Sequence, residues 1–245
     1  MALRAWSDCP IRESGEPLVC IPAELHRLEP HPYAALGAPY GLDGDPFRLR
    51  QGVISRLLRA QSILQETCPG RRLAIFDAWR PLVVQAFMVE HAIDQECGSR
   101  GLNRHDMNHA NAVKEVESAV GRFWAPPSSD PLTPPPHSTG AAVDLTFADG
   151  NGLPMAMGGE IDAIGDISHP DYYAAQASSA PHSMESLWHQ RRSELAEVML
   201  AAGFVQHPNE WWHFSYGDQL WAWRSGGAEA IYGSCPDSSS IERTI

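Results

Sequence analysis

The chain has 245 residues, a formal net charge of −12, 43% hydrophobic residues and 20% charged residues. This length suits one well-buried domain and is short for two, and the composition is ordinary for a soluble globular protein. An acidic balance without any run of Lys and Arg argues against nucleic acid and anionic membranes as partners. A small neutral or cationic substrate fits this charge better.

The cysteines and the N-terminal sequence bear on the cellular compartment. Five cysteines at wide, irregular spacings, with no Cys-x-x-Cys pair, indicate neither a thiolate zinc site nor a disulfide framework. The N-terminus has no apolar stretch of signal-peptide length, and no window reaches the roughly 18 apolar residues of a membrane span. We therefore expect reduced thiols in a cytoplasmic protein.

The first half of the chain is expected to combine an irregular segment with helices and a strand. Residues 1–50 are rich in Pro, Gly and polar side chains, which is typical of an irregular segment with short extended pieces. Apolar residues at helical spacing predict a helix over 53–64, which ends before a Pro-Gly pair. The apolar run 73–76 predicts a buried strand, and Pro81 suits the first turn of a helix that reaches about Cys97.

The second half continues this alternation. An amphipathic pattern predicts a helix over 113–123. The Pro-rich segment 125–136 cannot be helical and is expected to cross the surface in an extended form. A strand is predicted over 141–147 and a turn over 149–152. A long helix is then expected over 187–202, ended by a glycine.

The C-terminal region is predicted to form a hairpin. Apolar patterns over 211–215 and 220–223 favour two strands joined by a tight turn at 216–218. From residue 233 the composition is typical of a frayed tail, 233–245, so residues 1–232 are expected to form a single domain. Interspersed helices and strands with a terminal hairpin favour an α+β fold with an antiparallel central sheet flanked by helices.

Two polar clusters far apart in the sequence offer the ligands of one metal site. The first contributes an imidazole, His137, and a carboxylate, Asp144; the second contributes His213, with Glu210 three positions before it. Together they supply three ligands and leave Glu210 as a spare base. A catalytic zinc needs three protein ligands, a fourth position open to water and a group that takes the proton of this water. The pattern therefore predicts metal-assisted hydrolysis.

The surroundings of these residues are compatible with such a site. Gly140 lets the first loop bend with its backbone close to a metal. Asp144 lies in an apolar run, where a buried carboxylate needs a partner such as a cation; the alternative role is to cap a turn. Glu210 and His213 point to opposite faces of an extended chain unless it bends, and Pro208-Asn209 can supply this bend.

These motifs resemble those of the M15 metallopeptidases of the D-Ala-D-Ala dipeptidase type. The family pattern Ser-x-His-x-x-Gly-x-Ala-x-Asp is matched from His137 to Asp144, and its Glu-Trp-Trp-His motif is matched by Glu210 to His213. The remaining matches are Asp77 to Pro81 for Asp-x-Tyr-Arg-Pro with Trp79 in place of Tyr, Met157 to Asp162 for Met-Gly-x-x-x-Asp, and, most weakly, Tyr33-Ala34 with Gly41 for Tyr-Ala-…-Gly.

The resemblance implies a Hedgehog/DD-peptidase-like fold and one zinc ion per chain, bound by His137, Asp144 and His213. It also implies that Glu210 acts as general base and then acid, and that Arg80 stabilises the oxyanion of the tetrahedral intermediate. This chemistry is consistent, because zinc lowers the pKa of water toward ~7 and an arginine offers permanently charged donors. Without the resemblance, Arg80 would be interpreted as a solvated residue at a helix start.

For the substrate, the resemblance implies D-Ala-D-Ala or a similar short D-containing peptide. Asp162 would bind its free ammonium and Tyr33 would line the pocket. A turn cap before Gly165 is the alternative role of Asp162. One position departs from the family pattern: Pro135 replaces the serine and removes a hydroxyl donor, which leaves the exact peptide open.

Two other functions are compatible with the same residues. A peptidoglycan D,D- or L,D-carboxypeptidase, or a related endopeptidase, would share the metal ligands but need an open cleft for a long chain. Asp162 favours a free amino terminus near the scissile bond, hence a dipeptide. A zinc-binding module without catalysis would need neither Glu210 nor Arg80.

Histidines outside the two clusters are weaker candidates for metal ligands. His105 and His109 are four apart, but the sequence lacks the glutamate that an HExxH metal motif places between them. The following histidines are expected to be exposed or to cap turns: His105, His109, His182, His189 and His207.

Overall fold

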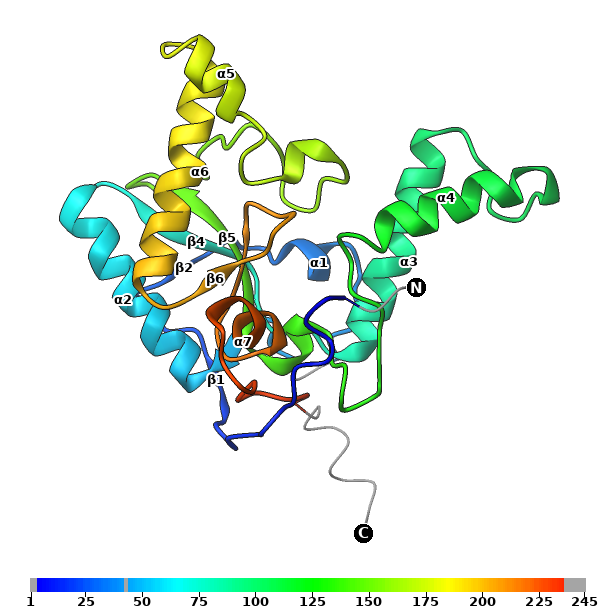
Figure 1. The fold of residues 1–245 in the computed structure, drawn as a ribbon, viewed down its shortest axis with the longest axis horizontal. Helices are drawn as coiled ribbons and strands as arrows, with labels where there is room; N and C mark the ends of the chain where they lie inside the picture. The colour runs from blue at the N-terminus through cyan, green and yellow to red at the C-terminus, as the bar shows by residue number, and fades with distance from the viewer. Residues whose placement is uncertain (1–3, 42–43, 236–245) are drawn as a thin grey trace.

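The computed structural model describes residues 4–41 and 44–235. Its centre is a five-stranded sheet with the strand order β2-β4-β5-β7-β6 (Figure 1). These strands are β2 (His26–Arg27), β4 (Arg72–Asp77), β5 (Ala142–Ala148), β6 (Val205–Gln206) and β7 (His213–Ser215). A second, two-stranded antiparallel sheet pairs β1 (Leu18–Cys20) with β3 (Arg48–Arg50).

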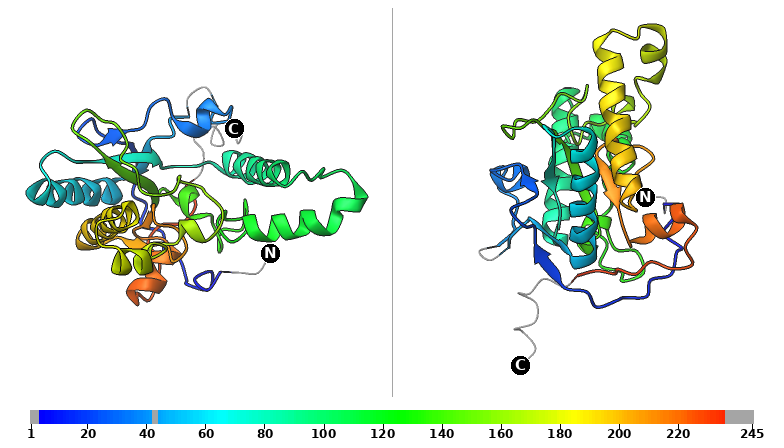
Figure 2. Two further views of the ribbon diagram at one scale, coloured as in Figure 1. Left: turned by 90° about the horizontal axis from the view of Figure 1, so that it is seen from above. Right: turned by 90° about the vertical axis from the view of Figure 1, so that its left-hand side faces the viewer.

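The helices form two groups around the central sheet. α2 and α6 lie side by side and pack on the sheet, whereas α3 and α4 form a hairpin that projects on the other side (Figures 1 and 2). One apolar core joins the sheet to α2 and α6, and a second cluster joins α3 to α4. The predicted α+β fold is confirmed. The α-helices of the described residues are α1 (Pro32–Ala35), α2 (Gln51–Thr67), α3 (Leu82–Ser99), α4 (Ala110–Val120), α5 (Ala174–Ser179), α6 (Met184–Ala201) and α7 (Gln219–Ser225).

The register of the sheet aligns three polar residues across its middle. β5 is antiparallel to both of its neighbours, with Asp144 opposite His213 in β7 and opposite Asp77 in β4. All 7 residues of β5 are buried, so polar side chains on this strand meet other side chains and not bulk water. The antiparallel prediction holds for these pairs, whereas β2 and β4 pair in parallel.

Most of the predicted elements are present with shifted ends. The helix expected over 53–64 is α2, which begins at Gln51 and ends at Thr67. The segments expected to form β4, α3, α4, β5 and α6 also do so. Gly203, with a φ of +96°, follows α6 as the sequence predicted. Periodicity therefore located these elements with only small shifts at their ends.

The prediction of a second hairpin strand at 220–223 is wrong. Residues 220–223 belong to helix α7, whose N-cap Asp218 accepts a hydrogen bond from the backbone N–H of Trp221 at 2.9 Å. An aspartate at this position favours a helix start, and here it outweighs the short apolar run. β7 pairs with β6 instead, which follows α6 in the chain.

The beginning of the expected tail makes contacts with the domain. The backbone N–H of Gly233 donates to Glu13 Oε2 at 2.6 Å, and that of Cys235 donates to the carbonyl of Ser138 at 3.0 Å. The rest of the expected tail, 236–245, lies outside the described residues. In the described part of the chain, no helix combines the length and the apolar character needed to cross a membrane. All five cysteines are unpaired.

Candidate active site

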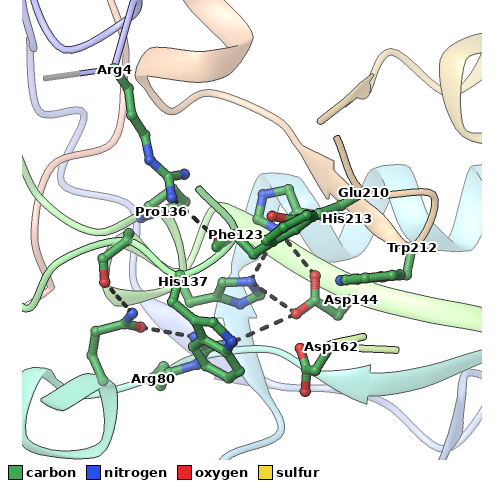
Figure 3. A pocket seen from close by; sticks show the side chains of 13 residues that line it. Arg4, Arg80, Phe123, Pro136, His137, Asp144, Asp162, Glu210, Trp212 and His213 are labelled. Atoms are coloured by element: carbon green, nitrogen blue, oxygen red, sulfur yellow. Dashed lines mark hydrogen bonds and ion pairs between the residues drawn. The ribbon is translucent and has the colours of Figure 1, made fainter. Parts of the chain in front are cut away.

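Three elements bring the predicted metal ligands together (Figure 3). His137 comes from a 3₁₀ turn, Asp144 from β5 and His213 from the start of β7. His213 Nδ1 lies 3.0 Å from Asp144 Oδ1, and His137 Nε2 lies 3.2 Å from both Asp144 Oδ2 and His213 Nδ1. One ligand atom from each residue lies within 4.8 Å of the other two, and all three residues are buried. They form one candidate metal site.

The turn that leads from His137 into β5 requires a glycine. Gly140 has a φ of +70°, and a Cβ at this position would lie 2.3 Å from Cδ2 of Leu18. Its carbonyl accepts a hydrogen bond from the backbone N–H of Arg50 at 2.9 Å. The left-handed backbone and the close neighbour both exclude a side chain here. Gly140 therefore fixes the path between the first two candidate ligands.

Hydrogen bonds on the far side of each imidazole fix its tautomer. His137 Nδ1 donates to the carbonyl of Ala78 at 2.8 Å, because a carbonyl can only accept. His213 Nε2 lies 3.3 Å from Ser215 Oγ, which donates to Asp218 Oδ2 at 2.7 Å and so accepts from the imidazole. His137 Nε2 and His213 Nδ1 therefore present lone pairs to each other. Outer partners of this kind are typical of metal-bound histidines.

The converging atoms suit a divalent cation better than a shared proton. Two imidazole lone pairs and a carboxylate meet with no hydrogen between them, and Asp144 Oδ1 has no hydrogen-bond partner among the described residues. A buried carboxylate in this state needs a compensating positive charge. Two nitrogens and one carboxylate oxygen are a suitable ligand set for catalytic zinc, which keeps a further position for water. The residues therefore fit a zinc ion.

Glu210 lies next to these ligands, in the loop between β6 and β7. The predicted bend is present, since the backbone N–H of Glu210 lies 3.4 Å from the carbonyl of His207, and that of His207 donates to the carbonyl of His213 at 2.9 Å. Glu210 Oε2 lies 3.6 Å from His213 Nδ1. Burial, together with the charge of Asp144, raises the pKa of Glu210 to about 8. A bound dication would favour the carboxylate form.

This raised pKa makes the stability of the metal-free protein depend on pH. The folded protein keeps a proton on Glu210 up to about pH 8, whereas the unfolded chain releases it near pH 4.5. Because the folded state binds more protons in this window, we expect the free energy of unfolding to fall as the pH rises through it. Urea unfolding with a chelator measures this slope. The Glu210→Gln variant should show a shallower slope, and an equally steep one would contradict the assignment.

Arg80 follows β4 and is buried, with 4% of the residue exposed. Its Nε and Nη2 donate to Asp77 Oδ2 at 3.1 and 2.7 Å, and its Nη1 donates to Gln85 Oε1 at 2.9 Å. Nη2 also lies 3.6 Å from Asp144 Oδ2. The alternative of a solvated residue at a helix start is therefore wrong. Asp77, to which the sequence assigned no role, fixes the guanidinium in the wall of the site.

Asp162 and Tyr33 contact each other. Tyr33 Oη donates to Asp162 Oδ2 at 2.7 Å. Asp162 is half-buried and lies after β5 on a loop that Arg192 ties down by donating to the carbonyl of Met157 at 2.8 Å. Loss of water around the carboxylate, together with the charge of Asp144, raises the pKa of Asp162 to about 7. Asp162 lines the pocket at the candidate ligands, whereas Tyr33 lies outside that pocket and supports Asp162.

His207 is a residue whose position the sequence did not indicate. Of the two roles expected for it, exposure or capping of a turn, the structure shows the second, since only 1% of the residue is exposed. Its Nδ1 caps the turn by accepting the backbone N–H of Asn209 at 3.3 Å, and lies 3.4 Å from Glu210 Oε1. Burial lowers the pKa of His207 well below its usual value, so its imidazole is neutral. Its spacing of three residues from Glu210 was the available signal. Of the other histidines with the same expectation, two are exposed and two half-buried: His105 and His182, then His109 and His189.

The site combines two buried histidines and a buried aspartate with a second carboxylate and an arginine beside them. This is the arrangement of a metal-dependent hydrolase. The family model described as D-Ala-D-Ala dipeptidase matches residues 26–227, and the chain belongs to this family, Peptidase_M15. The resemblance inferred from the motifs is therefore confirmed, and with it the expectation of a zinc metallopeptidase.

Two sequence relatives agree with this assignment. A D-alanyl-D-alanine dipeptidase of Synechocystis sp. is 44% identical over 225 residues, which cover 91% of this chain and 90% of the relative. A D-alanyl-D-alanine dipeptidase of Escherichia coli is 28% identical over 166 residues, covering 68% of this chain and 65% of the relative. A solved structure of a vancomycin-resistance D,D-pentapeptidase in complex with Zn(II) covers 91% of this chain and 96% of that one, at 16% identity and a TM-score of 0.44.

Proposed function

We propose that this protein hydrolyses D-alanyl-D-alanine or a similar short D-dipeptide with one zinc ion per chain. Its family and the name of its 44% identical relative support this substrate. The observation that carries the proposal is the convergence of His137 Nε2, Asp144 and His213 Nδ1 beside Glu210. A zinc-binding module without catalysis is not favoured, because such a module has no use for a buried base and a fixed arginine.

The chain's own side chains divide the chemistry between them. His137, Asp144 and His213 would hold the zinc ion, which when bound would act as a Lewis acid on the scissile carbonyl and lower the pKa of water toward ~7. Glu210 accepts a proton from the attacking water and later delivers it to the departing amine. Arg80 donates to the oxygen that gains negative charge, and because hydrogen bonds already fix its guanidinium, no reorganisation is needed.

We assign the recognition of the free amino terminus to Asp162. Its carboxylate lines the pocket and accepts a hydrogen bond from Tyr33. A substrate ammonium that leaves water needs an ionic partner there, and its charge in turn stabilises the ionised form of Asp162. A carboxypeptidase would instead require room for the rest of a long chain at this point.

The test compares D-Ala-D-Ala with its N-acetyl derivative, using the zinc-loaded protein. The parent should strongly prefer the free dipeptide. Asp162→Asn should weaken transition-state binding of the free dipeptide by roughly 2–5 kcal/mol, the usual loss for a truncated charge pair, provided that the bound substrate buries this pair fully. Its activity on the acetylated compound and its zinc content should change little. If the parent cleaves both compounds equally well, the carboxypeptidase function replaces the dipeptidase function.

We also propose that the enzyme acts in the cytoplasm on short peptides containing D-amino acids, such as those released from peptidoglycan. The unpaired state of its five cysteines supports a reducing compartment.

A further inference from the structure

Arg4, from the N-terminal segment, reaches into the catalytic pocket. Its side chain lines this pocket together with Glu210 and the candidate metal ligands. Figure 3 shows Arg4 entering from one side of these ligands while Asp162 lies on the other. Nη2 of Arg4 donates to the carbonyl of Phe123 at 3.3 Å. Burial lowers the pKa of Arg4, and the charge of Glu210 opposes this shift.

The segment that carries Arg4 is anchored to the domain. The ring of Trp6 meets the ring of His207 edge-on, with the centroids 5.5 Å apart. The buried side chain of Gln219 donates to the carbonyls of Ser7 and Cys9 at 3.0 and 2.7 Å. These contacts fix the chain directly after Arg4. They therefore hold the guanidinium of Arg4 at the pocket.

The charge of Arg4 lacks an anionic partner in the described part of the chain. No carboxylate oxygen lies within 4.0 Å of its guanidinium there, whereas Arg80, the other arginine in the pocket wall, is paired with Asp77. A guanidinium that has lost water gains from an anion brought by a ligand.

A free dipeptide brings opposite charges at its two ends. With its ammonium bound by Asp162, the other end of the dipeptide would extend past the metal ligands toward the side from which Arg4 enters. We propose that Arg4 binds the C-terminal carboxylate of the dipeptide substrate and closes the pocket to longer peptides at that end. The inference rests on the dipeptidase function proposed above. The planar fork of an arginine suits a carboxylate, which accepts two parallel hydrogen bonds from it.

The experiment compares D-Ala-D-Ala with D-Ala-D-Ala amide, which keeps the scissile bond and the ammonium but loses the carboxylate charge. In the Arg4→Gln variant, kcat/KM for the acid should fall about 10- to 100-fold, the usual effect of one charge-assisted hydrogen bond, mainly through a higher KM. The amide should be cleaved as by the parent. Arg4→Lys, which keeps the charge but not the fork, should lose less.

Arg12→Gln is the matched control, because it removes the same charge from the same segment at an exposed position, 3.6 Å from Glu229. It should leave both reactions unchanged. Equal losses on acid and amide in Arg4→Gln would overturn the inference and assign Arg4 to the chemical step, and unchanged hydrolysis of the acid would overturn it as well. A parent that cleaves neither compound would refute the dipeptidase function itself, and this inference with it.

Discussion

Glu210→Gln is expected to keep the fold and the zinc ion while losing about 10²–10⁴-fold in kcat, the usual contribution of a general base. Glutamine has nearly the same shape as glutamate but cannot accept a proton from water at neutral pH. The substitution also breaks little else, because Glu210 Oε1 has no hydrogen-bond partner among the described residues. Steady-state hydrolysis of D-Ala-D-Ala, with the zinc content measured in the same preparation, checks this result.

Glu66→Gln serves as the matched control for this variant. Glu66 is exposed on α2, so the same change of charge and shape there should leave the activity unchanged. A Glu210→Gln enzyme whose activity stays within a factor of about three of the parent would show that another group takes the proton.

The candidate ligands could be predicted from the sequence because the information is local. Spacing and residue type within the two clusters identified His137, Asp144 and His213. The bend at Glu210 followed from the need to turn the side chains of Glu210 and His213 toward the same site. What the sequence did not contain is the register that sets Asp144 directly opposite His213 in the sheet. Pairing between strands depends on packing over the whole domain, and a slip by one residue would turn the ligand to the other face.

The wrong strand at 220–223 has a local origin, whereas the residues that the sequence did not indicate depend on contacts between distant segments. The apolar run at 220–223 is compatible with a strand or a helix, and the cap provided by Asp218 decides for a helix. Arg4 and His207 lie in segments whose composition indicates only loops. Their positions in or beside the pocket follow from the contact between Trp6 and His207, which joins the N-terminal segment to the β6–β7 loop. Single-residue roles of this kind emerge only when distant segments are placed together.

Removal of one imidazole is expected to release the metal. In His213→Ala, two of the three candidate ligands remain, and Asp144 loses the nitrogen that lies 3.0 Å from its Oδ1. Zinc prefers at least three protein ligands, so we expect far less than one zinc ion per chain after dialysis and no measurable hydrolysis. Elemental analysis of the dialysed protein gives the stoichiometry. His137→Ala should behave in the same way, and either variant with a full zinc ion would refute the assignment.

The size of the loss in zinc affinity distinguishes a metal ligand from a residue that only orients a ligand. Ser215 Oγ is the acceptor that keeps the proton on His213 Nε2 and the lone pair on Nδ1, and Ser215 is fully buried. Ser215→Ala should therefore keep all three ligands but bind zinc about 10–100-fold more weakly, the usual effect of losing an outer partner of a metal-bound histidine. Competition with a chelator measures this affinity. If Ser215→Ala binds zinc as tightly as the parent, Ser215 does not hold the tautomer of His213 that presents Nδ1 to the metal.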